Sequence, residues 1–228
     1  MATLYIVGTP IGNLEDVTLR VLRVLKEVDV ILCEDTRVTK RLLEKYEIGG
    51  KRLIAYNEQE SGIKIEKIVE LLKEGKDLAL VSDAGTPGIS DPGSYLVQKI
   101  REYSKKVEPL KIESVPGPSA LTAALSIAGV PAHDFVFLGF LPHKKGRETL
   151  FKEIAGSERA MIFYESPHRI LKALESLEKF APGKKVTIAR ELTKIHEQII
   201  AGVPAELLKY LQINPDKVRG EFVVIVSV

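Results

Sequence analysis

Cysteine is nearly absent from this chain of 228 residues, in which Cys33 is the only one. A single thiol excludes an intrachain disulfide and any metal site built from several cysteines. Such low cysteine usage is typical of a reducing compartment. We therefore expect a cytoplasmic protein that holds no metal.

Long apolar stretches are missing as well. No uninterrupted run approaches the ~20 residues that a membrane-spanning helix needs. The segment Met1–Gly8 contains no basic residue, and its apolar run is too short for a secretory signal. We therefore expect a chain without a membrane partner.

Neither sign of charge dominates the sequence. The 33 lysine and arginine residues face 31 aspartate and glutamate residues, which gives a formal net charge of +2. This balance neither requires nor excludes a nucleic-acid partner, which must be argued from local clusters. The clearest cluster is His143–Arg147, in a predicted loop that could reach a phosphate backbone.

Short β-branched runs alternate with amphipathic segments along the chain, which predicts an α/β fold with mostly parallel strands. The predicted strands are Leu4–Val7, Val28–Cys33, Leu78–Val81, Lys111–Val115, Phe135–Leu138, Arg159–Tyr164, Lys185–Ala189 and Phe222–Val226. The predicted helices are Val17–Lys26, Thr36–Tyr46, Asp91–Tyr103, Ser119–Ala128 and Pro167–Leu177, with an amphipathic segment at Glu66–Lys73. Asp35, Asp91 and Ser166 are expected to cap helices.

The segment Pro116–Pro118 interrupts this alternation. It divides the chain into two α/β domains, which we place at residues 1–114 and 119–228. Ligands of α/β sheets bind at the carboxyl ends of the strands. With two such domains, we expect a ligand in the cleft between them.

Three loops rich in glycine and proline follow predicted strands: Gly8–Asn13, Ser82–Gly93 and Val115–Ala120. Glycine lets a backbone approach a ligand closely, and Asp83 could accept hydrogen bonds from a ribose or an amino group. The helix after Pro118 offers free N–H groups to a carboxylate or phosphate. Neither a dinucleotide fingerprint nor a P-loop is present. Alone, Ser82–Gly93 fits a rigid surface turn and Val115–Ala120 fits an interdomain linker, but the combination of three such loops favours a binding site.

Charged residues follow three other predicted strands, in the segments Glu34–Arg37, Glu165–Arg169 and Arg190–Lys194. Clusters at strand ends belong at the mouth of an α/β site. Each cluster could also be a solvated helix cap, since Asp35 and Ser166 are good capping residues.

Taken together, the motifs of this chain resemble those of the tetrapyrrole methylase superfamily, and most closely its ribosomal branch. The resemblance extends from Leu4 to about Val226 and depends on Thr9–Asn13, Glu34–Arg37, Ser82–Gly93, Pro116–Ala120, Tyr164–Arg169, Ala189–Lys194 and Gly220–Phe222. Two departures from the superfamily pattern argue against a porphyrin-type substrate. Ser82-Asp83-Ala84 replaces the usual Gly-Asp-Pro, and Gly8–Gly12 replaces a Gly-x-Gly-Pro-Gly-like loop.

The resemblance implies a homodimer that binds S-adenosyl-L-methionine in the cleft between its α/β domains. It implies methylation of the ribose 2′-oxygen of a decoding-centre cytidine, with 16S rRNA or the small ribosomal subunit as partner. The implied cofactor residues are Pro10, Ile11, Asp83, Gly85, Thr86, Ser119, Ala120, Tyr164 and Ala189. The candidate RNA contacts are Arg37, His168 and Arg169, together with Lys144, Lys145 and Arg147 of the basic loop. A base would help a hydroxyl to react, and the candidates by position are Asp35, Glu165, Glu191 and Lys194.

Four other functions stay open at this point. The chain could methylate a tetrapyrrole or a protein, or it could bind the cofactor as a non-catalytic ribosome-assembly factor. The opening loop and the segment Glu165–Arg169 favour RNA over a tetrapyrrole, and binding without turnover would reveal an assembly factor. The loops alone also allow a protein with a phosphate ligand.

Overall fold

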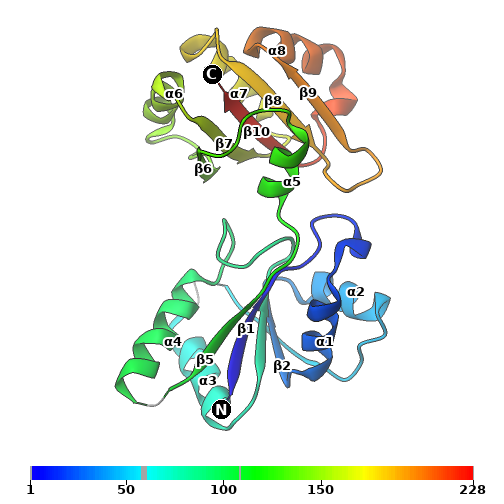
Figure 1. Cartoon of the computed structure of the whole chain (residues 1–228), viewed down its shortest axis with the longest axis vertical. Coiled ribbons are helices and arrows are strands. Elements are labelled where there is room, and N and C mark those ends of the chain that lie inside the picture. Colours follow the sequence, from blue (N-terminus) through cyan, green and yellow to red (C-terminus); the bar gives the residue numbers. More distant parts are fainter. Residues whose placement is uncertain (1, 58–60, 108, 228) are drawn as a thin grey trace. The chain divides into compact units, whose positions relative to one another are not determined.

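A computed structural model describes residues 2–57, 61–107 and 109–227. The chain divides into two compact units, Met1–Ser119 and Ala120–Val228, and each has its own sheet (Figure 1). Within the described ranges, no helix combines the length and the apolar character needed to cross a membrane.

The first unit contains a five-stranded parallel sheet in the order β3-β2-β4-β1-β5. Its strands are β1 (Thr3–Val7), β2 (Val30–Cys33), β3 (Arg52–Ala55), β4 (Leu78–Val81) and β5 (Lys111–Val115). Its helices are α1 (Leu19–Glu27), α2 (Thr36–Lys45), α3 (Ser61–Lys73) and α4 (Ser94–Lys106), with a 3-10 turn at Leu14–Asp16.

Helices cover both faces of this sheet (Figure 1). Along β4, Leu78 and Leu80 pack into one core with α3 and α4, while Ala79 and Val81 pack into a second core with α1 and α2. Successive side chains of a strand point to opposite faces, so a sheet buried on both faces needs apolar residues at every position. This requirement explains the short continuous apolar runs in the sequence.

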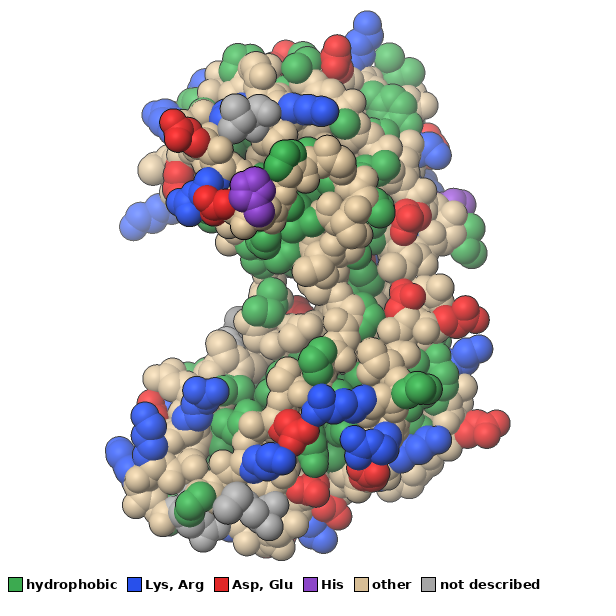
Figure 2. Space-filling view, in the orientation of Figure 1, with side chains coloured by type: hydrophobic (Ala, Val, Ile, Leu, Met, Phe, Trp, Pro, Cys, Tyr) green, Lys and Arg blue, Asp and Glu red, His purple; other side chains and the backbone are tan. Residues whose placement is uncertain are grey.

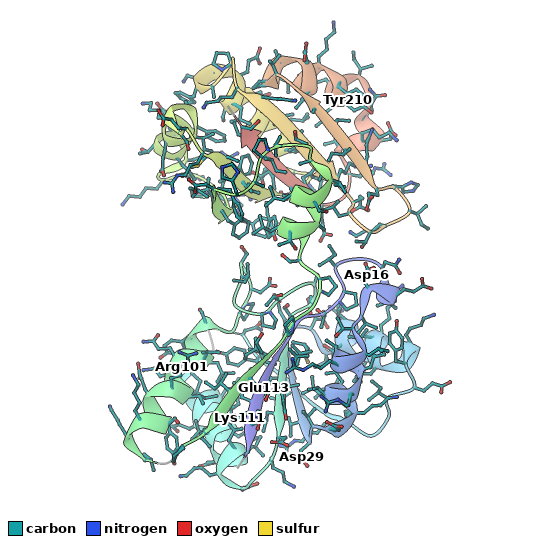
Figure 3. The ribbon with its side chains drawn as sticks, viewed as in Figure 1. Asp16, Asp29, Arg101, Lys111, Glu113 and Tyr210 are labelled. Carbon is teal, nitrogen blue, oxygen red and sulfur yellow. The ribbon has the colours of Figure 1, made fainter. Side chains whose placement is uncertain are left out.

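The edge strand β5 carries charged side chains instead. Lys111 and Glu113 lie two residues apart on one face of β5 (Figure 3) and form an ion pair at 2.6 Å. Arg20 of α1 also pairs with Glu113, at 2.5 Å. Charged side chains on an edge strand discourage pairing with another chain.

Four strands of the first sheet end in register. Val7 of β1 lies opposite Val81 of β4 and Val115 of β5, and Cys33 of β2 also lies opposite Val81. The loops that follow these strands therefore begin side by side at one edge of the sheet.

The second unit contains a five-stranded mixed sheet in the order β6-β7-β10-β8-β9. Its strands are β6 (Phe135–Phe140), β7 (Ala160–Glu165), β8 (Lys185–Arg190), β9 (Gln198–Gly202) and β10 (Phe222–Ser227). Its helices are α5 (Ala120–Ile127), α6 (Arg147–Gly156), α7 (Ile170–Phe180) and α8 (Pro204–Ile213), with a 3-10 turn at Pro215–Val218.

The expectation of mostly parallel strands is wrong for this second sheet. Only β6 and β7 pair in parallel, whereas β10 runs antiparallel to β7 and β8, and β8 runs antiparallel to β9. The connection from β8 to β9 consists of residues 191–197, which is too short for the crossover that parallel neighbours need.

The core of the second unit lies between one face of its sheet and the helices α6, α7 and α8 (Figure 1). Phe163 of β7 and Ile188 of β8 are fully buried there against Leu174 of α7 and Leu211 of α8. Tyr210 of α8 also accepts a hydrogen bond from the Gln198 side chain of β9 at 2.8 Å (Figure 3).

Helix α4 begins at Ser94, so the prediction that Asp91 caps it is wrong. The N-cap is Gly93, whose φ of 142° is a conformation that side chains rarely adopt. A Cβ at this position would lie 2.9 Å from Cδ2 of Leu80, so the chain turns tightly against the sheet before the helix starts.

Helix α7 begins at Ile170, so the prediction that Ser166 caps it is also wrong. Ser166 instead begins a turn in which its carbonyl oxygen accepts from the N–H groups of Arg169 and Ile170, each at 3.0 Å. The helix therefore begins after this turn, with Arg169 at its N-cap position.

Candidate active site

The three glycine- and proline-rich loops meet at the carboxyl edge of the first sheet. Thr9 and Gly85 exchange two backbone hydrogen bonds, at 2.8 and 3.1 Å. The buried Thr9 hydroxyl donates to the Ser82 carbonyl oxygen at 3.0 Å. The Gly8 N–H donates to the Val115 carbonyl oxygen at 3.0 Å, which joins the third loop to the first.

Gly8 and Gly117 allow the first and third loops to pack closely together. A Cβ on Gly8 would lie 2.8 Å from the backbone nitrogen of Gly117, closer than real Cβ atoms come to backbone. The predicted cofactor residues Ile11 and Gly85 also come together, since a Cβ on Gly85 would lie 3.6 Å from Cγ2 of Ile11 and 3.8 Å from the Pro118 carbonyl oxygen. The absence of side chains at these glycines therefore lets the backbones of the three loops pack directly against one another.

Carboxylates gather at the same edge. The backbone N–H of Asp35 donates to the Asp83 carboxylate at 2.9 Å, which links the ends of β2 and β4. Burial raises the pKa of Glu34, and the neighbouring Asp83 and Asp91 carboxylates raise it further. Burial also raises the pKa of Asp91. The edge therefore has a negative potential that suits a cationic group or a donor hydroxyl. Among the described residues, no group of side chains is arranged to hold a metal ion.

Asp35 caps helix α2, as predicted. Its carboxylate accepts the Arg37 N–H at 2.8 Å and pairs with the Arg37 guanidinium at 2.6 Å. The hydrogen bonds from the Arg37 side chain and backbone lower the pKa of Asp35 to about 2. The Arg37 side chain remains 88% exposed, so it can meet a large partner.

A buried charge lies at the end of β7 in the second unit. The Glu165 side chain is 0% exposed and pairs with Arg169 at 2.8 Å and with Arg147 at 3.5 Å. It also accepts the Ser166 N–H at 2.8 Å. Both guanidinium groups also donate to backbone carbonyl oxygens, Arg169 to that of Leu141 at 2.9 Å and Arg147 to that of Pro142 at 3.2 Å. The neighbouring Lys144, Lys145 and His168 are exposed.

A second charged group follows β8. Lys194 donates to Glu191 at 2.8 Å and to Glu221 at 2.7 Å. Burial lowers the pKa of Lys194, but the hydrogen bonds to the two carboxylates outweigh it and raise the pKa overall. Burial likewise raises the pKa of Glu191, but hydrogen bonds from Lys194 and the Glu221 N–H outweigh it and lower the pKa overall. The ion pair is therefore charged at neutral pH.

The sequence places Arg190 in the strand-end cluster Arg190–Lys194 without giving it a role of its own, and the structure buries it beside this group. Its guanidinium donates to the carbonyl oxygens of Arg219 at 2.6 Å, His196 at 3.3 Å and Asp216 at 3.5 Å. It thereby ties the loop after β8 to the approach to β10. A lone arginine at a strand end gives no signal that its partners are backbone carbonyl groups.

The predicted cofactor residues fall in both units. Pro10, Ile11, Asp83, Gly85, Thr86 and Ser119 belong to the first unit, and Ala120, Tyr164 and Ala189 to the second. In the second sheet, Val223 of β10 lies opposite Tyr164 of β7 on one side and Ala189 of β8 on the other. These three residues therefore form one row across adjacent strands. Phe137 packs edge-to-face on Tyr164, with ring centroids 4.9 Å apart.

The sequence does not reveal that β10 lies between β7 and β8, so it does not show that Val223 lies between Tyr164 and Ala189. The apolar run of β10 predicts a strand but does not indicate which strands lie beside it. Thr9 belongs to the motif Thr9–Asn13, but the sequence does not show that its hydroxyl joins the first loop to the Ser82 carbonyl oxygen.

Solved structures share this architecture. The structure matches the methyltransferase CobJ with a TM-score of 0.70 at 23% identity, over 100% of this chain and 94% of that one. It matches a uroporphyrin-III-C-methyltransferase from Thermus thermophilus with a TM-score of 0.67 at 19% identity, over 100% and 94% of the two chains. The chain therefore has the two-sheet α/β fold of these methyltransferases, and the predicted fold class is confirmed.

The family follows from the sequence comparison. The family model of Tetrapyrrole (Corrin/Porphyrin) Methylases matches residues 3–208, and the chain belongs to this family. It is an S-adenosyl-L-methionine-dependent methyltransferase, as predicted.

Two relatives named ribosomal RNA small subunit methyltransferase I are similar over nearly the whole chain. The protein from Thermotoga maritima is 46% identical over 227 residues, which cover 100% of this chain and 99% of that protein. The protein from Escherichia coli O157:H7 is 46% identical over 226 residues, which cover 98% and 77%.

Proposed function

We propose that this chain methylates the ribose 2′-oxygen of a decoding-centre cytidine in small-subunit rRNA. The observation that carries this proposal is the 46% identity, over essentially full length, to a protein named ribosomal RNA small subunit methyltransferase I. The substrate would be 16S rRNA or the small ribosomal subunit. An enzyme acting on ribosomes would work in the cytoplasm, and the family resemblance implies a homodimer, which analytical ultracentrifugation would test.

The residues at the loop junction fit the cofactor. S-adenosyl-L-methionine, when bound, supplies a methyl group that its sulfonium centre makes electrophilic. The carboxylate edge around Asp83 suits its positive charges and its ribose hydroxyls. The first unit would use Pro10, Ile11, Asp83, Gly85, Thr86 and Ser119, and the second unit Ala120, Tyr164 and Ala189.

The four candidate bases differ in how well they could take a proton. Glu165 is enclosed by two guanidinium groups, and the raised pKa of Lys194 keeps its amine protonated. Asp35 and Glu191 are ionised carboxylates, but the lowered pKa of each makes it a weak base. We therefore keep Asp35 and Glu191 as candidates and assign most of the acceleration to alignment of the hydroxyl and exclusion of water.

The proposed RNA contacts fall into two groups. Arg37, Lys144, Lys145 and His168 are exposed and can reach phosphate groups, whereas Arg147 and Arg169 are held by Glu165. Figure 2 shows acidic and basic side chains interspersed over the visible surface, consistent with the formal net charge of +2. Binding to RNA would therefore depend on these few positions more than on a field of the whole protein.

The test is methyl transfer from labelled cofactor to small ribosomal subunits, or 16S rRNA, that lack the modification. Mass mapping of the RNA is expected to show one 2′-O-methylcytidine. Cofactor binding in calorimetry without any RNA methylation would contradict the substrate and leave a non-catalytic assembly factor. Methylation of a tetrapyrrole or a protein in parallel incubations would support a different substrate on the same fold.

A further inference from the structure

The carboxylate of Glu165 is fully buried, yet it does not face any open position. One oxygen meets Nε of Arg169 at 2.8 Å, and the other meets Nη2 of Arg147 at 3.5 Å. Both arginine side chains are only 15% exposed. A carboxylate enclosed in this way cannot approach a reacting hydroxyl. Its function must therefore be sought in the contacts that the two arginines make.

Both arginines hold the same loop, the segment Leu141–Gly146 between β6 and α6. Arg169 donates to the carbonyl oxygen of Leu141, and Arg147 donates to that of Pro142. The backbone N–H of Arg147 also donates to the Lys144 carbonyl oxygen at 3.2 Å, which closes the loop at the start of α6. Glu165, at the end of β7, thus pairs with both arginine side chains that hold this loop.

The fixed loop carries exposed positive charge. Lys144 and Lys145 are both exposed within it. A buried ion cluster such as Glu165 with two arginines costs about as much in desolvation as it returns in attraction, so it is weak evidence for stability alone. Its clearer effect is to hold the backbone of the basic loop in one arrangement.

We propose that Glu165 is a positioning residue that, through Arg147 and Arg169, fixes the loop Leu141–Gly146 so that Lys144 and Lys145 bind RNA phosphate groups. The inference rests on the proposed function, because it takes rRNA as the partner. A loop that is already ordered loses less conformational entropy when it binds, so positioning raises affinity without adding a contact. Arg147 and Arg169 then act on the RNA through the loop and not as direct phosphate ligands.

The experiment is a double-mutant comparison. Affinity for 16S rRNA is measured at several salt concentrations for the wild type, Glu165→Gln, the double variant Lys144→Ala/Lys145→Ala, and the combination. In the wild-type background, loss of two phosphate contacts is expected to weaken binding and to reduce the slope of log K against log salt by about 1.4–1.8. In the Glu165→Gln background the same lysine changes are expected to alter affinity less than about twofold, because the lysines are no longer held in place.

Loop order is read separately by limited trypsin digestion, which cleaves after Lys144 and Lys145. Glu165→Gln is expected to speed this cleavage about tenfold or more, because local opening exposes the loop. Glu153→Gln, which alters an exposed carboxylate of α6, is the matched control and is expected to change neither readout. Arg147→Lys, which keeps the charge but loses the forked geometry, gives the same test if Glu165→Gln does not fold.

The outcomes separate the two proposals. Equal effects of the lysine substitutions in both backgrounds, or unchanged trypsin cleavage in Glu165→Gln, would overturn the positioning role while wild-type RNA methylation still stands. If the wild type neither binds nor methylates 16S rRNA, the proposed function fails, and the RNA part of this inference fails with it. Cofactor affinity of Glu165→Gln is expected to equal that of the wild type, and its loss would assign Glu165 to the cofactor site instead.

Discussion

The backbone N–H of Asp35 and the carboxylate of Asp83 are joined by a hydrogen bond of 2.9 Å, which ties the loop after β2 to the loop after β4. Asp83 therefore helps to organise the carboxyl edge of the first sheet, in addition to the cofactor contact proposed for it. The structural role of Asp83 can be separated from its proposed cofactor contact by comparison with Asp77. The Asp77 carboxylate accepts a hydrogen bond from the Thr3 N–H at 2.7 Å in the same unit.

Asp83→Ala is expected to weaken S-adenosyl-L-methionine binding by about 10- to 100-fold, the range for one lost hydrogen bond to a charged group. Isothermal titration calorimetry measures the change. Asp77→Ala removes a similar carboxylate–backbone hydrogen bond, but at the start of β4 and not at the loop junction. It is expected to lower stability without altering cofactor affinity. Unchanged affinity in Asp83→Ala would remove Asp83 from the cofactor site.

Glu34 is expected to make stability depend on pH. Its pKa is raised above the ordinary value of 4.5, first by burial and then by Asp83 and Asp91. Its contribution to stability is therefore complete below about pH 4.5 and is lost as pH rises through the folded-state pKa. Glu34→Gln removes this loss, so the variant is expected to melt above the wild type at pH 7.

Thermal melts between pH 4 and pH 7 measure this effect. The difference in melting temperature between Glu34→Gln and the wild type is expected to shrink as pH falls. Glu44→Gln, at an exposed position of α2, is the control and should give a difference that does not vary with pH. A Glu34→Gln difference that is constant over this range would contradict the prediction.

Lys194 is expected to act as a fixed positive charge between Glu191 and Glu221. Its raised pKa leaves no neutral amine at pH 7, so arginine should replace it in function. We expect Lys194→Arg to keep methyl transfer within about threefold of the wild type, and Lys194→Ala to reduce it about tenfold or more by leaving two carboxylates unpaired. Single-turnover rates with labelled cofactor give the comparison, and loss of activity in Lys194→Arg would restore Lys194 as a candidate base.

Gly8→Ala is expected to lower the free energy of unfolding by about 1–3 kcal/mol, because the added methyl group would collide with the backbone of Gly117. Chemical denaturation measures the loss. Gly156→Ala is the matched control, since a Cβ on Gly156 would meet no described atom within 4 Å and alanine favours the helix that it ends. Equal stability of Gly8→Ala and the wild type would show that the two loops can separate.

Four of the five strands of the first sheet could be predicted from the sequence, because their apolar runs alternate with amphipathic segments. The edge strand β3 (Arg52–Ala55) was missed, because it is short and begins with a charged residue. The predicted strands Leu78–Val81 and Lys111–Val115 match the structure residue for residue. The meeting of the three loops also follows from chain order, since parallel strands release their loops at one edge.

The second unit was less predictable. The edge strand Gln198–Gly202 and the helices Arg147–Gly156 and Pro204–Ile213 were missed, because their short apolar patterns are broken by charged or small residues. Without α6, the sequence could not show that Arg147 turns inward toward Glu165. The four strand-terminal candidates looked alike in sequence. Only their burial and partners distinguish Glu165, which is fully buried between two arginines, from Asp35, whose side chain is 27% exposed.

The position of β10 has a consequence for synthesis on the ribosome. Chains emerge from the N-terminus, and domains generally fold as units in that order. The first sheet is complete once β5 has emerged, whereas the second lacks its central strand until Phe222–Ser227 is made. Until then β7 and β8 present unpaired edges, which are prone to aggregation. The order of the strands therefore makes the second unit the later and more vulnerable one during translation.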